Sequence, residues 1–426
     1  MRILHVSHQY PPDRRGGVET YTATLAAHQA GQGHSVSVLH GWADRVSEPP
    51  ILRRVENPPA EGAVFAPRSR PARHPLELFI RSFHNPAIDI AFAGLLDTQP
   101  PDVVHIQHLK GLSARLIGVA QARGIPVVWT LYDWWAFCGN AQLVRHTGRL
   151  CEGPRLWLNC ADCAAHHGGM ALDPLQGSVA LAAAPGVASL FAYRARLLDA
   201  ALRQANVLIA PTPFVRDRFI QQGAPADRIR IVEHGIVYAP AAPRAPHIRP
   251  RLGYVGGLAW QKGVHVLVEA FNRLPDDAAD LMIYGDPRPF PDYTRQLTGL
   301  ARHPRIRFLG PFTANRRAEV MADLDLIVVP SVWPETSNLV AQEAFAAGAP
   351  VVASRVGALA DRVRDGVDGR LVPPGDVGAL AAVLGELAAD AGALASLRAG
   401  VRPPRRLDDH AAAVADVYRA ALGRAR

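Results

Sequence analysis

Short apolar runs alternate with helix-length amphipathic segments along most of the chain, beginning with RILHVS near its N-terminus. The runs are rich in valine, isoleucine and leucine, as expected for strands of a parallel sheet that is buried on both faces. Strands that alternate with helices are typical of βαβ units. A first set of strands is predicted at residues 3–7, 35–39, 103–107, 127–131, 207–210 and 229–232, and a second set at residues 252–255, 281–284, 306–309, 326–329 and 351–353.

The two sets of strands predict two domains. Between them, residues 238–251 are rich in proline and contain few side chains that could pack in a core. We therefore expect two doubly wound, Rossmann-like α/β domains, at residues 1–240 and 252–404, joined by a linker at residues 241–251. Two such sheets would face each other across a cleft at the carboxyl ends of their strands, where ligands of open α/β sheets bind.

Two segments fall outside this alternation. Residues 408–426 follow a pair of prolines and contain an amphipathic pattern, so we expect a C-terminal helix that packs back on the first domain. Residues 134–167 contain all four cysteines and three of the seven tryptophans. We expect this second segment to be an insertion in the first domain.

The loop and helix that follow the strand at residues 326–329 predict an anion-binding site. The sequence there is PSVWPETSNLVAQEAFAAGAP, and the helix is predicted at residues 339–347. Backbone amides at a helix N-terminus, with the helix dipole behind them, suit a phosphate group. The amides concerned belong to Thr336, Ser337, Asn338 and Leu339.

Two glutamates in the same stretch are eight positions apart. Glu343 lies one turn into the helix, where its carboxylate could accept hydrogen bonds from two hydroxyl groups of a ribose. Glu335 lies in the preceding loop and would meet a different part of the same ligand. The pair alone is weak evidence, but the SVWPE sequence before it and the small-residue turn after it make the combination specific.

Two glycine turns supply further groups for an anion. In YVGGLAWQKG, at residues 254–263, a glycine turn that contains Gly257 leads to Lys262 at the start of a helix, so that backbone amides and an ammonium group come together. Gly16 and Gly17 form the turn between the first strand and the first helix. Any tight turn of this kind needs glycine, so this pair by itself says little about a ligand.

These motifs, together with DVVHIQH at residues 102–108, resemble those of the retaining nucleotide-sugar glycosyltransferases of the glycosyltransferase family 4 type, whose architecture is called GT-B. The resemblance covers nearly the whole chain in the right order. It implies a UDP-, GDP- or ADP-sugar donor held mainly by the second domain and an acceptor held mainly by the first. In bacteria it implies transfer of a hexosyl group to a saccharide or lipid-linked saccharide during the biosynthesis of cell-surface polysaccharides.

The resemblance also implies a role for each motif. Lys262 would hold the diphosphate, Glu343 the ribose hydroxyls and Glu335 the donor sugar, with the helix amides beside it. Gly16 and Gly17 would approach the diphosphate from the first domain. Catalysis would require no metal, because Lys262 and the amides would stabilise the charge that grows on the leaving diphosphate.

Three positions depart from the family's pattern. Gly257 stands where an arginine of the diphosphate clamp is common, and Arg14 or Arg15 could supply the missing charge. Tyr132 stands where many relatives have a histidine; it could hydrogen-bond a sugar hydroxyl but could not act as a readily charged group. Arg355 stands where an acidic residue is frequent.

His108, at the end of its predicted strand, and Asp133 are the remaining candidates for orienting a hydroxyl group of the donor or acceptor. A lone histidine at a strand end is equally well explained as a structural hydrogen-bonding group. With Lys262, Glu335 and Tyr132, these two residues complete the predicted catalytic set.

The four cysteines lie within 26 of the 426 residues and end in a CxxC motif. Such clustering suggests that they act together. Four thiolates suit a structural tetrahedral zinc site, and a reducing cytosol disfavours disulfides. A disulfide pair or free thiols remain the alternatives for Cys138, Cys151, Cys160 and Cys163.

The net charge of +8 does not indicate a nucleic-acid partner, because the 46 lysines and arginines are spread along the chain without a basic helix or stripe. One segment is locally basic, with Arg68, Arg70, Arg73 and Arg81 ahead of apolar side chains. It predicts either peripheral contact with an anionic membrane or a solvated loop and helix. The apolar run at the N-terminus is too short for a signal peptide, which favours the cytoplasm.

Two other functions stay open on the sequence. A nucleotide-sugar epimerase of the same fold would need acid–base carboxylates and histidines in its sugar pocket, and the spacing of Glu335 and Glu343 favours transfer instead. A non-catalytic protein that binds a sugar nucleotide is favoured by Gly257 and Tyr132.

Overall fold

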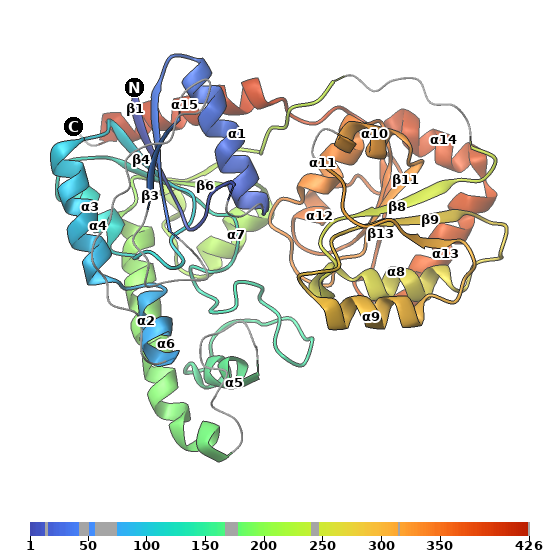
Figure 1. Cartoon of the computed structure of the whole chain (residues 1–426), viewed down its shortest axis with the longest axis horizontal. Helices are drawn as coiled ribbons and strands as arrows, with labels where there is room; N and C mark the ends of the chain where they lie inside the picture. The colour runs from blue at the N-terminus through green and yellow to red at the C-terminus, as the bar shows by residue number, and fades with distance from the viewer. Residues whose placement is uncertain are drawn as a thin grey trace. The chain divides into compact units, whose positions relative to one another are not determined.

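The computed structural model describes residues 1–12, 16–41, 51–55, 75–166, 178–239, 247–313 and 316–424. The chain divides into two units, one of Met1–Glu233 with Asp408–Arg426 and one of His234–Leu407 (Figure 1). Each unit has one mainly parallel sheet flanked by helices, so the doubly wound α/β class expected from the sequence is confirmed.

The sheet of the first unit has seven strands in the order β3-β2-β1-β4-β5-β6-β7, all parallel except for the antiparallel pair β2 and β3. The strands are β1 (Arg2–Ser7), β2 (Ser35–His40), β3 (Ile51–Val55), β4 (Val103–Ile106), β5 (Val127–Thr130), β6 (Val207–Ala210) and β7 (Ile229–Ile231). Six of them match the predicted strands to within one residue at each end. The edge strand β3 was missed because its sequence, ILRRV, has two adjacent arginines where a central strand would be apolar.

Helices flank this sheet, and the last helix of the chain is among them (Figure 1). Leu25 of the first helix and Val414 and Tyr418 of the last one share a buried cluster with Ile3 and Val38 of the sheet. The helices are α1 (Gly17–Gly31), α2 (Pro75–Arg81), α3 (Pro86–Thr98), α4 (Leu116–Gln121), α5 (Leu158–His166), α6 (Ser178–Gln204), α7 (Pro213–Gln221), the 3-10 helix η1 (Ala226–Arg228) and α15 (Leu407–Arg424).

The second unit has a six-stranded parallel sheet in the order β10-β9-β8-β11-β12-β13. Its strands are β8 (Arg251–Val255), β9 (Asp280–Tyr284), β10 (Ile306–Phe308), β11 (Leu326–Val329), β12 (Val351–Ser354) and β13 (Gly369–Val372). Its helices are η2 (Trp260–Lys262), α8 (Val264–Phe271), α9 (Pro291–Leu300), α10 (Arg317–Ala322), α11 (Leu339–Ala346), α12 (Ala358–Arg362), α13 (Val377–Ala389) and α14 (Ala391–Gly400). The sequence predicted every strand here except β13, whose four residues, GRLV, include a glycine and an arginine.

The central strand β11 shows why these strands are continuously apolar. Leu326 and Val328 point into one core, which contains side chains of α8 and α13. Ile327 and Val329 point into a second core on the opposite face, with side chains of α10 and α11. Because successive side chains alternate between faces that are both covered, every position of the strand is buried.

The predicted domain boundary and linker differ from the structure. The second unit begins at His234, and the N–H of Ile236 donates to a carbonyl of that unit at 3.0 Å. Beyond residues 240–246, which lie outside the described residues, His247 Nδ1 is 2.7 Å from Asp325 Oδ2. The described residues on both sides of that gap therefore belong to the second unit, because their polar groups find partners there.

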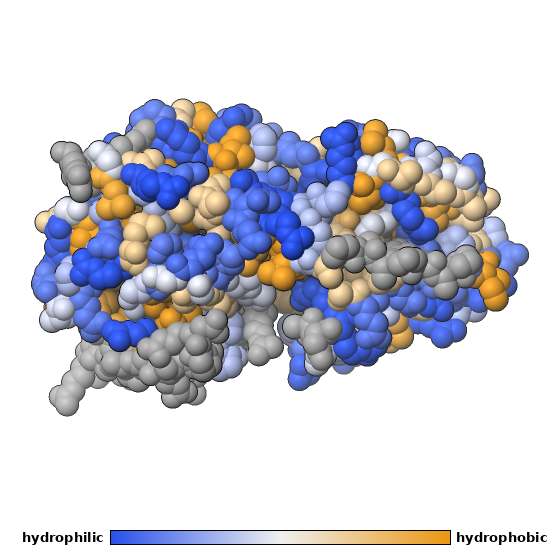
Figure 2. All heavy atoms as spheres, turned by 90° about the horizontal axis from the view of Figure 1, so that it is seen from above, coloured by the Kyte–Doolittle hydropathy of each residue, from blue (hydrophilic) through white to orange (hydrophobic). Residues whose placement is uncertain are grey.

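Among the described residues, no single helix is long and apolar enough to span a bilayer; α13 and α14 pass that test only as a pair, across a bend of 100°. On the face seen in Figure 2, hydrophobic residues form small groups among hydrophilic ones. Arg68, Arg70 and Arg73 of the locally basic segment lie outside the described residues. In its described part, Phe79 and Phe83 are buried, so these rings are not presented to a membrane.

Candidate functional site

Glu335 lies in the loop between β11 and α11 and is only 4% exposed. Its Oε1 accepts hydrogen bonds from Lys262 Nζ at 2.8 Å and from Ser331 Oγ at 2.7 Å. Lys262 Nζ also lies 5.1 Å from the centre of the Trp333 ring. The two predicted charges of the second unit are therefore neighbours and hold each other in place.

Two glycines allow close backbone contacts around the segments that carry these charges. Gly263 follows Lys262 with φ of 71°, and a Cβ there would lie 1.9 Å from Pro330 O. Gly357 has φ of 59°, and a Cβ there would lie 2.4 Å from Glu335 O. Only glycine permits both the left-handed backbone and the close approach, so both positions set the loop geometry.

The N-terminus of α11 presents backbone amides, as predicted. Asn338 is left-handed, with φ of 55°, and its Oδ1 accepts the N–H of Ala341 at 2.9 Å. Thr336 is buried, and Ser337 Oγ lies 2.9 Å from His234 Nδ1, so that hydroxyl is held inside the unit. The N–H groups of Leu339 and the residue after it have no acceptor within the helix and suit an anion.

Glu343 lies on α11, with a side chain that is 14% exposed. Arg317 donates to its Oε1, whereas its buried Oε2 has no hydrogen-bond partner among the described residues. Burial raises the pKa of this carboxyl, although Arg317 opposes the change. A buried carboxylate oxygen without a partner is costly, and a pair of sugar hydroxyls would satisfy it.

Gly257 borders open space, because a Cβ there would meet nothing within 4 Å. The backbone of the turn therefore does not require glycine at this position, and no side chain of the described residues lies within 4 Å of where the Cβ of a second cation would begin. Arg14 and Arg15, the predicted substitutes, lie outside the described residues.

In the first unit, the glycine turn packs against the buried carboxylate of Glu19. A Cβ on Gly16 would lie 2.4 Å from Glu19 Oε2, whereas one on Gly17 would meet nothing within 4 Å. Glu19 Oε1 lies 3.1 Å from His8 Nε2. Gly16 thus makes room for Glu19, and Gly17 leaves the start of α1 accessible.

His108 and Asp133 form a hydrogen-bonded pair after β4 and β5. His108 Nδ1 accepts the N–H of Lys110 at 3.0 Å, so the neutral ring carries its proton on Nε2 and donates it to Asp133 Oδ2 at 3.0 Å. Asp133 Oδ1 accepts the N–H of Trp135 at 2.8 Å. Burial acts to raise the pKa of Asp133, but His108 and the Trp135 N–H hold it below its usual value.

The two imidazoles of this edge of the sheet are in contact, with 4.4 Å between the ring centres of His8 and His108. Burial, and then His108, lower the pKa of His8. His8, His108, Glu19 and Asp133 therefore form one cluster of two neutral rings and two carboxylates. His8 and Glu19 were not predicted from the sequence, although His8 follows β1 and Glu19 belongs to the GGVE turn.

The hydroxyl of Tyr132 has a hydrogen-bond partner within the first unit. Its hydroxyl donates to Gln107 Oε1, and its ring packs against the buried cluster of the first unit. Burial raises its pKa well above the usual value. The Tyr132 hydroxyl, which was expected to contact a sugar, is thus hydrogen-bonded within the first unit. Arg355, the third departure, bonds to Asp365 at the surface.

None of the four cysteines is paired in a disulfide in the structure. One group of three potential metal ligands in the described structure has its ligand atoms within 4.8 Å of one another. It consists of His146, Asp162 and His166 rather than cysteines.

Known proteins resemble this chain in sequence. D-inositol 3-phosphate glycosyltransferase of Xylanimonas cellulosilytica is 37% identical over 244 residues, which cover 52% of this chain and 58% of that protein. The chain thus matches little more than half the length of this relative. Glycogen synthase of Mycobacterium tuberculosis is 28% identical over 452 residues, covering 99% of this chain and 95% of that protein.

Solved structures share the fold over nearly the full length. Sucrose-phosphate synthase of Thermosynechococcus elongatus has a TM-score of 0.69 at 20% identity and covers 99% of both chains. HepE of Anabaena in complex with UDP has a TM-score of 0.63 at 17% identity and covers 98% of this chain and 99% of its own. The two-domain fold is therefore that of the GT-B glycosyltransferases.

Two family models match the two units. The model described as Glycosyl transferases group 1 matches residues 249–390, and the one described as Glycosyltransferase Family 4 matches residues 15–238. Since the second model covers more than half of the chain, the chain belongs to glycosyltransferase family 4, as its motifs predicted.

Proposed function

We propose that this chain is a retaining glycosyltransferase. It transfers a hexosyl group from a UDP- or GDP-sugar to a hydroxyl of a saccharide or lipid-linked saccharide, in the biosynthesis of a cell-surface polysaccharide. The observation that carries the proposal is the arrangement in the second unit: the Lys262–Glu335 pair, the open amides of α11 and the unsatisfied oxygen of Glu343. The names of the sequence relatives support the same class of reaction.

Each of these groups has a donor moiety that fits its chemistry. Lys262 and the α11 amides suit a diphosphate, because both offer positive charge and N–H donors. The free oxygen of Glu343 suits the ribose hydroxyls. A bound diphosphate competes with the Glu335 carboxylate for the ammonium group of Lys262. When Lys262 binds the diphosphate, Glu335 becomes available to hold the donor sugar.

In the proposed mechanism, His108 does not act as a general base. Both nitrogens of His108 are engaged, one by the Lys110 N–H and one by Asp133, so this ring has no lone pair for a proton. The acceptor proton then passes to the leaving diphosphate. The bond between the anomeric carbon and the phosphate oxygen breaks as the acceptor oxygen bonds on the same face, and Lys262 and the amides stabilise the leaving group by about 3 kcal/mol per donor.

Thermal shift with UDP, GDP, ADP and their sugar conjugates tests donor binding. A ligand that binds only the folded state raises the melting temperature, so we expect a shift for one nucleotide that is lost in Lys262→Ala and Glu343→Ala. The other lysine of the chain, exposed Lys110, provides a matched control, and Lys110→Ala should keep the shift. No shift with any nucleotide would contradict the proposal.

A non-catalytic sugar-nucleotide-binding protein is the second candidate, because of the open space at Gly257. The two candidates differ in turnover. Incubation with the preferred donor and a panel of saccharide acceptors should yield a product whose anomeric configuration, seen by NMR, matches that of the donor. Donor binding without any product across the panel would favour the second candidate, and an inverted product would exclude retention.

A further inference from the structure

The insertion between Asp133 and the end of α5 exposes several large apolar side chains and contains strained backbone. Leu150, Leu156 and Leu158 are 50%, 79% and 51% exposed. Four of the five non-glycine residues with positive φ in the described structure lie here: Ala141, Leu143, Leu156 and Trp157. Such backbone persists only where surrounding structure imposes it, so another constraint must hold this segment.

The four cysteines occupy positions from which a metal could supply that constraint. Cys138 precedes a hairpin in which Val144 and Leu150 pair, and Cys151 closes it by donating its N–H to Leu143 O at 2.7 Å. Cys160 and Cys163 lie three residues apart near the start of α5, so they share one face of the helix.

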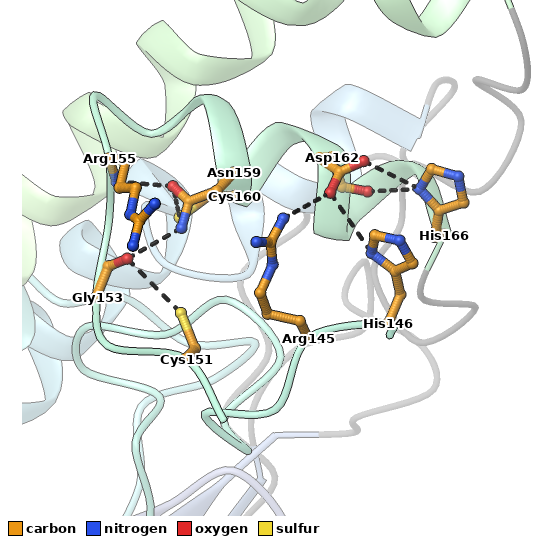
Figure 3. Close-up of polar contacts among 9 residues, drawn as sticks. All are labelled: Arg145, His146, Cys151, Gly153, Arg155, Asn159, Cys160, Asp162 and His166. Atoms are coloured by element: carbon orange, nitrogen blue, oxygen red, sulfur yellow. Dashed lines mark hydrogen bonds and ion pairs between the residues drawn. The ribbon is translucent and has the colours of Figure 1, made fainter. Parts of the chain in front are cut away.

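Polar contacts through Asn159 link Cys151 to Cys160. Cys151 Sγ is 3.6 Å from Gly153 O, and Asn159 Nδ2 is 2.9 Å from the same oxygen. Asn159 Oδ1 in turn lies 4.0 Å from Cys160 Sγ, so one asparagine joins the two cysteines (Figure 3).

The surroundings of the cysteines carry uncompensated positive charge. Arg194 of α6 is 2% exposed, donates to Trp135 O and has no ion pair with a carboxylate among the described residues. Its charge interacts with those of Cys138 and Cys160. A buried guanidinium needs an anion, and four thiolates on Zn²⁺ carry two more negative charges than the metal neutralises.

We propose that Cys138, Cys151, Cys160 and Cys163 together bind one structural Zn²⁺ ion. The four thiols lose their protons as four Zn–S bonds form, and Arg194 balances part of the resulting charge. The ion holds the hairpin to α5, and through Arg194 it steadies Trp135, whose ring centre lies 5.4 Å from that of His108. This inference does not depend on the proposed function.

The group of His146, Asp162 and His166 is the competing ligand set (Figure 3). Arg145 already donates to Asp162 Oδ2 at 3.0 Å, so the carboxylate is neutralised. His166 Nδ1 lies 2.8 Å from the carbonyl oxygen of Asp162, which requires a proton on that nitrogen rather than a metal. The cysteines offer stronger and more numerous ligands for zinc.

The metal content of the full chain is the first test. Protein produced with added zinc and purified without chelators should contain one zinc per chain by plasma mass spectrometry. Less than a tenth of that amount, or the recovery of the cysteines as disulfides after alkylation and mass spectrometry, would overturn the proposal.

Paired variants then identify the ligands. Cys160→Ser with Cys163→Ser should lose the zinc, whereas His146→Ala with His166→Ala should retain it. The reverse result would assign the metal to the histidine group and overturn the cysteine site.

Substitution with cobalt tests the cysteine site in the wild-type chain, even if the cysteine variants do not fold. The wild-type chain loaded with Co²⁺ should show a thiolate-to-cobalt charge-transfer band and intense visible bands of tetrahedral coordination. A weak octahedral spectrum without charge transfer would exclude a tetrathiolate site.

Discussion

At the scale of single residues, His5 shows how burial and hydrogen bonding choose one protonation state. Its Nε2 lies 2.8 Å from Gln29 Oε1 and its Nδ1 lies 2.9 Å from Gln107 Nε2. The amide of Gln107 is oriented by Tyr132, which donates to its oxygen. The Gln107 N–H therefore points at Nδ1, and only a neutral ring can accept it. Burial lowers the pKa of His5 from 6.5 to about 4, although Gln29 opposes the change.

We expect this histidine to make the folded chain sensitive to acid. Between pH 6.5 and 4 the unfolded state binds a proton that the folded state does not, so the free energy of unfolding falls as the pH falls through that window. His5 alone accounts for about 2 kcal/mol of loss by pH 5. Urea titrations at pH 7 and pH 5 should show a smaller loss for His5→Gln than for the wild type. Equal losses in the two proteins would contradict the assignment.

At the scale of elements, the site in the second unit depends on how closely two segments approach. The turn that carries Lys262 and the loop that carries Glu335 touch where Gly263 meets Pro330. The N–H of Val332 donates to Gln261 O at 3.0 Å and joins the same segments. The distance from Lys262 to Glu335 is therefore a property of the backbone as much as of the two side chains.

Gly263→Ala should destabilise the second unit by about 3 kcal/mol or more, because it combines left-handed strain with overlap against Pro330 O. Gly366 is the matched control, since it has φ of 75° and a Cβ there would meet nothing within 4 Å. Gly366→Ala should cost only about 1 kcal/mol of backbone strain. Urea titration measures the loss of free energy of unfolding in both variants. Equal losses would show that the contact with Pro330 contributes nothing.

At the scale of the whole molecule, the two ends of the chain are joined inside the first unit. Tyr418 of α15 has its hydroxyl 2.7 Å from His105 Nδ1 and 3.2 Å from Gln29 Nε2. His105 Nε2 continues the network to Thr130 Oγ1 at 2.7 Å. The last helix thus completes the hydrogen bonds of β4, β5 and α1, so the first unit needs the C-terminus of the chain.

Tyr418→Phe should lower the free energy of unfolding of the first unit by about 3 kcal/mol, because it leaves buried groups of His105 and Gln29 without partners. Tyr193 makes a similar bond to His84 at 2.7 Å but is 38% exposed. Tyr193→Phe should therefore cost less than about 1 kcal/mol, since water replaces the lost partner. If urea titration shows a similar loss of free energy of unfolding for the two variants, the buried network does not contribute as expected.

Strand positions and the chemistry of the site motifs were predictable because both depend on local sequence. The run LIVV at β11 presents apolar side chains on both faces of the strand. Lys262, Glu335 and Glu343 lie in turns and helix starts, and neighbouring residues set the geometry of such segments. The edge strand β3 and the short strand β13 were missed because their stability comes from the neighbouring strand rather than from their own composition.

The sequence by itself determined the fold class, the family and the residues of the second unit that carry charge. Only the tertiary structure decided which of those charges meet, where the second unit begins, that Tyr132 bonds to Gln107 and that His8 and Glu19 join His108 and Asp133. The physical reason is that these outcomes rest on contacts between residues far apart in the chain. Local propensity does not encode the burial and hydrogen-bond partners that such contacts create.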